Sequence, residues 1–177
     1  MTITAIKNAV TEVVLPPVTP EAYREGMSSL AAAVNVVTTT SPQGNVGFTA
    51  TAVCSVSDTP ATLLVCLNRG ASVHQVFKNS THLVINTLTS QHQLISNAFG
   101  GKAPMNERFE IGDWVESTTG CPRLADAAVS FDCIITDVKS VATHDVIFCQ
   151  VVDIKQDPEA DALLYYQRGY HSACKDA

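Results

Sequence analysis

The fold is predicted most directly by residues 34–67, which read VNVVTTTSPQGNVGFTATAVCSVSDTPATLLVCL. β-Branched side chains, which favour strands, fill three segments of this stretch. Ser41-Pro42-Gln43-Gly44 and Asp58-Thr59-Pro60 have the residue types of turns and separate the segments. We therefore expect strands over Val34–Thr40, Val46–Ser57 and Thr62–Leu67, the first two paired as a hairpin.

Short helices are expected on either side of this stretch. Residues 1–18 are expected to form an N-terminal arm, and Thr19-Pro20 has the residue types of an N-cap and a first helical position. Capping-box spacing places further helix starts at Ser72 and Ser90, and the second of these helices ends at Gly100-Gly101. Pro122 is expected to open a last helix, which runs to Ala128.

The remaining strands follow one another through turns rather than through long helices. They are expected over Leu83–Leu88, Ser130–Val138, Val146–Ile154 and Leu163–Tyr166. Such a succession favours a mainly β fold, an antiparallel β-barrel with short helices packed outside it. Residues 19–177 are expected to form this single domain.

Charge is scarce and unevenly placed. Charged residues make up 16% of the 177, the net charge is −6, and Asp58 is the only charged residue between Gly26 and Asn68. Polar residues interrupt every apolar stretch before it reaches the roughly 20 residues of a membrane span. No basic stripe predicts nucleic-acid binding, and no secretory signal opens the chain, so a cytoplasmic protein is expected.

Metal and disulfide chemistry are not expected. The six cysteines show no CxxC spacing, and most lie in apolar runs, which indicates reduced, buried thiols. The five histidines show neither HxH nor HxxxH spacing, so no metal site is predicted.

Residues 47–52, GFTATA, form the most informative segment for function. Every side chain after Phe48 is small, and Thr49 and Thr51 place hydroxyls on one face of a strand. Small residues let a flat ring with amide edges approach the backbone closely. A strand packed tightly beneath a helix would need the same composition, so both interpretations stay open.

Residues 68–72, NRGAS, join a buried strand to an expected helix start. Free N–H groups and the helix dipole favour a phosphate at such a place. Arg69 is the only cation between Arg24 and Lys78 and would supply a charge-assisted contact. The alternative is a helix cap at Ser72 beside a solvated arginine.

Several motifs resemble those of one known family. The runs are MSSLAAAVNVVTTTSPQGNVGFTATAVCSVSDTPATLLVCLNRGASVH, NTLTSQHQLISNAFGG, ERF, GDW followed by TGCPRL, THDVIFCQV and LLYYQRGY. In this order they resemble the short-chain flavin reductases, the reductase components of two-component flavin monooxygenases such as 4-hydroxyphenylacetate 3-monooxygenase. The resemblance runs from about Tyr23 to Tyr170.

The resemblance implies a split β-barrel, a homodimer and hydride transfer from NAD(P)H, with NADH favoured, to FMN or FAD. Reduced flavin would then pass to a separate monooxygenase. The implied isoalloxazine contacts are Thr49, Ala50, Thr51 and Ala52, the implied ribityl phosphate contacts are Asn68, Arg69 and Ser72, and the residues closing the flavin pocket are Phe99 and Arg108. His144 and Tyr170 would meet the nicotinamide nucleotide, and no catalytic base is implied.

Two departures and two alternatives accompany this interpretation. Gly70-Ala71 replaces hydroxyl residues common in the family, and Cys149 stands at a usual glycine position, where it could crowd the dinucleotide. The segment at 47–52 equally suits a non-catalytic flavin-binding protein of the same fold, and a purely structural dimeric barrel is a weaker alternative. In each case the charge-poor strands would be covered by core on one face and by flavin or a partner subunit on the other.

Overall fold

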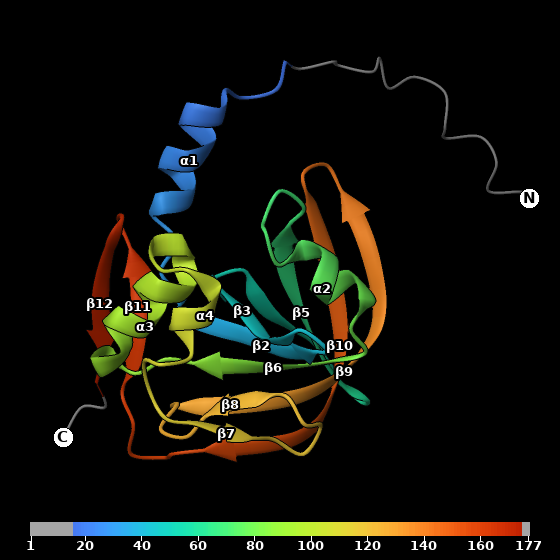
Figure 1. Ribbon diagram of the computed structural model, residues 1–177. Coiled ribbons are helices and arrows are strands. Elements are labelled where there is room, and N and C mark those ends of the chain that lie inside the picture. The colour runs from blue at the N-terminus through green and yellow to red at the C-terminus, as the bar shows by residue number, and fades with distance from the viewer. Residues whose placement is uncertain (1–15, 175–177) are drawn as a thin grey trace, which may run out of the picture.

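The computed structural model describes residues 16–174 and is mainly β (Figure 1). A seven-stranded antiparallel sheet holds, in spatial order, β3 (Gly44–Ala50), β2 (Asn35–Ser41), β6 (His82–Thr87), β9 (Val129–Val141), β10 (His144–Gln156), β5 (Ala61–Asn68) and β4 (Val53–Asp58). A second sheet contains β1 (Ala32–Ala33), β11 (Ala162–Tyr166) and β12 (Gly169–Ala173), and a third pairs β7 (Trp114–Glu116) with β8 (Pro122–Leu124). The predicted mainly β, antiparallel class is confirmed.

The link between β3 and β4 explains why the large sheet curls. These strands are consecutive in the chain, yet they lie at opposite edges of the seven-stranded sheet. Only Thr51 and Ala52 separate them. A two-residue link cannot span a flat sheet of seven strands about 4.8 Å apart, so the two edges must meet and the sheet closes toward a barrel.

This link also corrects one expectation. The single strand predicted over Val46–Ser57 is two strands, because β3 pairs with β2 while β4 pairs with β5. The run of β-branched and small residues continues across the link, so composition gave no sign of the break.

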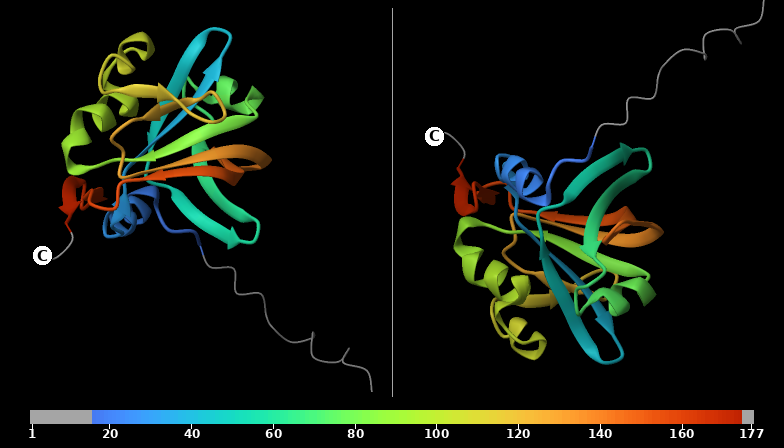
Figure 2. Two further views of the ribbon diagram at one scale, coloured as in Figure 1. Left: turned by 90° about the horizontal axis from the view of Figure 1, so that it is seen from below. Right: turned by 90° about the horizontal axis from the view of Figure 1, so that it is seen from above.

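Within residues 16–174, six short helical segments surround the barrel. They are α1 (Pro20–Ser28), α2 (His74–Asn79), the 3₁₀ turn η1 (Ser90–His92), α3 (Gln93–Asn97), the π-helical turn η2 (Ala98–Lys102) and α4 (Met105–Arg108). Thr19 caps α1, as predicted, by accepting a hydrogen bond from Ala22 N at 3.2 Å. Figures 1 and 2 show α1 outside the barrel, near β11 and β12.

The core has two parts because β2 is buried on both faces. Its neighbours Val36 and Val37 point to opposite sides of the sheet and are both fully buried. Val37 packs inside the barrel with Val65, Phe77 and Leu83. Val36 packs on the other face with residues of the helical layer, Leu88, Ile95, Phe99 and Leu163. A strand buried on both faces tolerates no charge, which accounts for part of the charge-poor stretch.

Three further expectations are wrong. Residues 122–124 form strand β8 instead of opening a helix, with proline as the first residue of the strand. α2 begins at His74 with Val73 at its N-cap, so Ser72 does not cap it. The second capping box involves Thr89 and His92, one position before the one predicted at Ser90. Strand β12 was not predicted.

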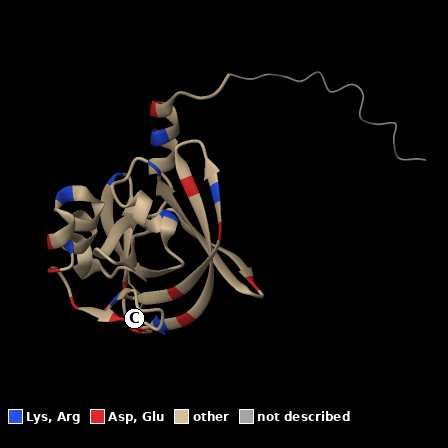
Figure 3. Cartoon of the chain, turned by 45° about the vertical axis from the view of Figure 1, so that its right-hand side comes forward, with Lys and Arg blue, Asp and Glu red and all other residues tan. Residues whose placement is uncertain are grey.

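The charged residues gather mostly on the helices and along the long β9–β10 hairpin (Figure 3). Strand β4 is exposed, although Asp58 at its end is its only charged residue. Among the described residues, none of the helices is long and apolar enough to cross a membrane. Apart from residues 16–18, the predicted N-terminal arm lies outside the part of the chain that the structure describes.

Candidate functional site

A cavity of about 470 Å³ opens where the two edges of the barrel meet. Its walls come from β3, the β3–β4 link, the end of β5 with the following loop, η2, α4 and the start of β10. The structure brings together here all the predicted site residues except two: Thr49, Ala50, Thr51, Ala52, Asn68, Ser72, Phe99, Arg108 and His144. The exceptions are Arg69 and Tyr170.

The wall at residues 49–52 is short-chained and firmly held. Thr49 Oγ1 donates a hydrogen bond to the carbonyl oxygen of Ser96 at 2.7 Å, which ties β3 to α3. Ala50 is buried, whereas Thr51 and Ala52 are exposed and line the cavity. A flat ring can therefore lie close to this backbone. The carbonyl oxygens of Thr51 and Ala52 already accept hydrogen bonds, from Val53 N at 3.0 Å and from Cys66 N at 3.1 Å.

The loop after β5 forms a compact turn. Asn68 Oδ1 accepts a hydrogen bond from Gly70 N at 2.8 Å, and the carbonyl oxygen of Asn68 accepts one from Ala71 N at 3.0 Å. Ser72 lines the cavity, and its hydroxyl has no hydrogen-bond partner within residues 16–174. Because this hydroxyl is not used as a helix cap, it is available to an anionic ligand.

Arg69 does not reach the cavity wall. Its guanidinium donates to the carbonyl oxygen of Ala142, and its backbone N–H donates to that of Thr143 at 3.0 Å. Arg69 thus joins the loop to the turn between β9 and β10. The sequence could not show this, because the acceptor lies 73 residues away.

Arg108 is the cation that lines the cavity, and it is only 8% exposed. Nε donates to the carbonyl oxygen of Ala103 at 2.9 Å, and Nη1 donates to those of Gly47 at 3.2 Å and Phe99 at 3.4 Å. Burial lowers the pKa of the guanidinium, which nevertheless stays charged. Nη2 makes no hydrogen bond to the described residues, so its hydrogens are free for a ligand.

Phe99 closes the cavity beside Arg108 and is fixed by other aromatic rings. Its centroid lies 5.0 Å from that of Phe109 and 5.3 Å from that of Trp114. Gly101 has φ +102°, a conformation that favours glycine, and lets the chain leave η2 beside the cavity. Phe99 therefore serves as a rigid side of the cavity.

A second cavity of about 430 Å³ adjoins the first and contains Tyr170. The two share Thr49, Thr51 and Gly100 as a common wall. Tyr170 Oη lies 2.8 Å from Ser96 Oγ and donates to Asn97 Oδ1 at 3.3 Å. Sequence reasoning missed Lys102 and Arg168, which also line this second cavity. Lys102 directly follows the run that ends in AFGG, and within LLYYQRGY a role was assigned to Tyr170 and not to Arg168.

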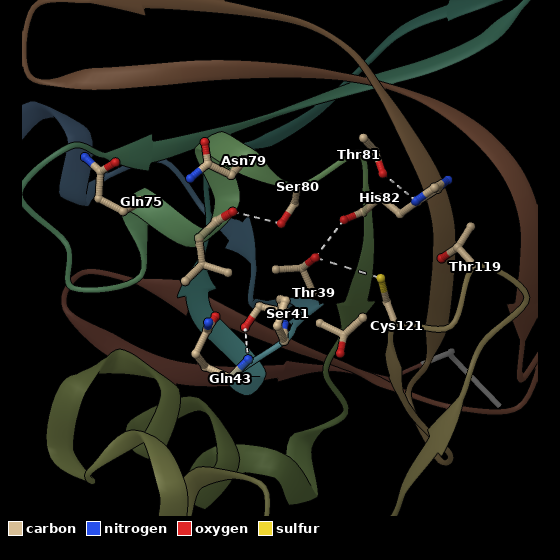
Figure 4. A pocket seen from close by; sticks show the side chains of 13 residues that line it. Thr39, Ser41, Gln43, Gln75, Asn79, Ser80, Thr81, His82, Thr119 and Cys121 are labelled. Atoms are coloured by element: carbon tan, nitrogen blue, oxygen red, sulfur yellow. Dashed lines mark hydrogen bonds between the residues drawn. The ribbon is translucent and has the colours of Figure 1, made fainter.

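A third cavity, of about 450 Å³, lies beyond the C-terminal end of α2 (Figure 4). Figure 4 shows uncharged polar side chains around it, among them Gln43, Gln75, Asn79 and Thr119. None of the predicted site residues lines it. It offers no cation to a phosphate and no small-residue wall to a ring, so the first cavity is the candidate site.

Cys149 does not line the first cavity or the one beside it. It is fully buried in the core, and burial raises the pKa of its thiol to about 12. The expected crowding of a dinucleotide is therefore wrong. Cys121 and Cys133 are also buried, whereas Cys54 and Cys174 are exposed. The expectation of buried thiols therefore holds for only some of the cysteines. All six described cysteines are free thiols.

Comparison with known proteins finds relatives of one family. The flavin reductase-like domain family matches residues 27–173. The FMN reductase (NADH) RutF of Enterobacter cloacae is 50% identical over 157 residues, which cover 89% of this chain and 96% of that protein. A Haemophilus somnus crystal structure described as a flavin reductase has a TM-score of 0.86 at 45% identity and covers 88% of this chain and 100% of its own. A homologue of nitrilotriacetate monooxygenase component B from Mycobacterium thermoresistibile is 25% identical, with a TM-score of 0.81 and 86% coverage of both chains.

Proposed function

Because the chain belongs to the flavin reductase-like domain family, we propose that it reduces FMN with NADH and supplies the reduced flavin to a separate monooxygenase. The observation that carries the proposal is the 50% identity to an FMN reductase (NADH) over 96% of that protein's length. A relative named as a monooxygenase component supports the partner class. The split β-barrel expected from the sequence is the fold of this family.

The residues around the first cavity fit FMN. The small side chains at 49–52 suit the isoalloxazine ring, and Phe99 borders it. Asn68 and Ser72 border the part of the cavity that we assign to the ribityl phosphate, and the free Ser72 hydroxyl can bind it. The unpartnered Nη2 of Arg108 supplies a charge-assisted donor to the flavin, the role that was expected of Arg69.

The bound flavin supplies the hydride acceptor, so the protein's own residues bind and orient the two reactants. His144 borders the first cavity and Tyr170 the second, on the two sides of the wall at Thr49 and Thr51. We assign both to the nicotinamide nucleotide. His144 Nδ1 lies 2.9 Å from Thr143 Oγ1, which fixes the ring, and the proposal gives it no proton to transfer.

Strand β4 supports the proposal that the protein is a homodimer. It is an edge strand, and edge strands exposed to water usually carry charges that prevent pairing. The only charged residue of β4 is Asp58, at its end, and Val56 is 48% exposed. Exposed apolar residues continue along β9 and β10 at Ile134, Val138, Val152 and Ile154. A second copy that covers these strands accounts for their composition.

The test is NADH oxidation, followed at 340 nm with purified protein and excess FMN, FAD or riboflavin. Loss of absorbance with FMN is expected, and no oxidation with any of the three flavins would refute the reductase. Tightly bound yellow flavin that NADH does not bleach would favour the non-catalytic flavin-binding alternative. Sedimentation equilibrium of the wild type and of V56K tests the dimer: a monomeric wild type contradicts it.

A further inference from the structure

A pair of buried side chains lies behind the loop that borders the proposed phosphate site, and the reaction described above does not use it. His74 is the first residue of α2 and 8% exposed; Asp145 is the second residue of β10 and 5% exposed. His74 Nε2 lies 2.7 Å from Asp145 Oδ2. An ionised carboxylate only accepts hydrogen bonds, so Nε2 donates.

Asp145 is the fixed member of this pair. It lies on β10, an interior strand of the large sheet, opposite Leu67 of β5 on one side and Ser140 of β9 on the other. Ser140 Oγ donates to Asp145 Oδ1 at 2.6 Å. The hydrogen bonds from Ser140 and His74 lower the pKa of Asp145, so the carboxylate is ionised and can accept both.

His74 connects that strand to the loop. Ser72 and Val73, which precede it, line the first cavity, and its own backbone N–H donates to the carbonyl oxygen of Ala71 at 3.0 Å. The N-cap of α2 has no side-chain hydrogen bond. The His74 side chain is therefore a main anchor of the segment that carries the free Ser72 hydroxyl.

We propose that His74 is a positioning residue whose hydrogen bond to Asp145 holds the loop at residues 68–73 in the conformation that binds the phosphate of FMN. This inference rests on the proposed function. The wall for the ring is held independently, by the bond from Thr49 to Ser96. Loss of the His74–Asp145 bond therefore weakens binding of the phosphate and leaves binding of the ring unchanged.

His92 provides a matched control. It is also buried, at 6% exposure, and its Nε2 lies 3.1 Å from Asp126 Oδ2. It lines neither the first cavity nor the adjoining one. His92→Leu and His74→Leu thus each remove a buried histidine that is paired with an aspartate, but only His74 adjoins the loop of the proposed phosphate site. His92 in addition accepts a hydrogen bond from Thr89 N at 3.1 Å, so H92L is the more severe structural change of the two.

The experiment compares dissociation constants for FMN and riboflavin, measured by quenching of flavin fluorescence. The wild type is expected to bind FMN more tightly than riboflavin. H74L should weaken FMN binding on the order of tenfold, with riboflavin binding unchanged. H74Q keeps a donor that reaches Asp145 and should restore most of the FMN affinity. H92L should lower the melting temperature and leave the ratio of the two constants at the wild-type value.

The outcomes separate this inference from the proposed function. If the wild type binds FMN and riboflavin equally, the proposed phosphate site is contradicted, and so is the role of His74 in holding it. Two outcomes refute the role of His74 alone while the wild type still prefers FMN. In one, H74L keeps the wild-type preference for FMN over riboflavin; in the other, H92L loses that preference as much as H74L does. If H74L does not fold, H74N replaces it, because its shorter side chain is polar but does not reach Asp145; an unchanged FMN preference in H74N refutes the inference too.

Discussion

Gly47 lies against the Cδ1 and Cε1 atoms of the Phe99 ring. A Cβ atom at position 47 would lie 2.8 Å from Cε1 of that ring and 2.9 Å from the carbonyl oxygen of Val37. Both contacts are shorter than packed atoms allow, and one of them is to backbone, which cannot rotate away. Since Arg108 also donates to the carbonyl oxygen of Gly47, position 47 joins β3, η2 and α4 at the cavity.

Replacing Gly47 with alanine should therefore damage both stability and flavin binding. We expect a loss of about 1–3 kcal/mol, because the added methyl overpacks a buried contact, and weaker FMN binding, because Phe99 must shift. Urea denaturation and fluorescence quenching measure the two effects. Gly26→Ala is the control: a Cβ there meets nothing within 4 Å, so the variant should be at least as stable as the wild type and bind FMN normally.

Arg108→Lys should weaken FMN binding although the charge is kept. Lysine lacks the planar fork with which Arg108 reaches the carbonyl oxygens of Ala103, Gly47 and Phe99. Buried carbonyl oxygens left without donors cost about 1–3 kcal/mol of stability. Arg24→Lys, at an exposed helical position whose partner is Glu21, should change neither quantity. Wild-type FMN affinity in R108K would contradict the role of the guanidinium.

Ser72→Ala should weaken FMN more than riboflavin while the melting temperature stays unchanged. The hydroxyl caps no helix and has no partner in the described chain, so its removal costs no stability. Its expected partner is the phosphate, which riboflavin lacks. Equal weakening of both flavins in binding titrations would show that the hydroxyl does not meet the phosphate.

His144→Ala should raise the KM for NADH more than it lowers kcat, because the proposed role is positioning. A fall in kcat of about 10²-fold or more would indicate acid–base catalysis instead. His82→Ala is a close control: the ring of His82 also contacts the hydroxyl of the preceding threonine, at 2.8 Å, but lies at the third cavity. Its KM for NADH should equal that of the wild type.

The pH dependence of stability should identify Asp145. Its pKa is lowered in the folded protein by hydrogen bonds from Ser140 and His74. The stabilisation is therefore fully present above the ordinary aspartate pKa of about 3.9 and is lost as pH falls through the lower folded value. D145N should be less stable than the wild type at pH 7, and the gap should narrow below about pH 4. A constant gap down to the end of the acid titration would contradict this.

Local patterns predicted the strands well where the chain pairs with its neighbour in sequence. The turn at Ser41–Gly44 and the pair β9–β10 were expected because turn residues and β-branched runs set them directly. The break at Thr51-Ala52 was missed because it depends on which strands become the edges of the sheet. Strand β8 was missed because pairing with β7 outweighs the tendency of Pro122 to open a helix.

The candidate site followed the same division. Thr49–Ala52 were predicted from residue size and hydroxyl placement, which are local properties. Ser72 was predicted from its place between a buried strand and an expected helix start, and from the family resemblance. Arg108 lines the cavity, as the resemblance implied, whereas the position of Arg69 outside it was not predictable, because the Arg69 guanidinium donates to the carbonyl oxygen of Ala142, far away in sequence. The burial of Cys149 likewise depends on packing between β10 and β5.

The distribution of the thiols affects how the enzyme is oxidised during turnover. Reduced flavin that meets dioxygen yields hydrogen peroxide, which oxidises thiolates far faster than thiols. Burial raises the pKa of both Cys133 and Cys149, so these core sulfurs stay protonated and out of reach. Cys66 lines the first cavity, but burial and the neighbouring Cys54 raise the pKa of its thiol too, so we expect the exposed Cys54 and Cys174 to be oxidised first. We therefore expect oxidation by hydrogen peroxide to begin at surface cysteines and to leave the packing of the barrel core intact.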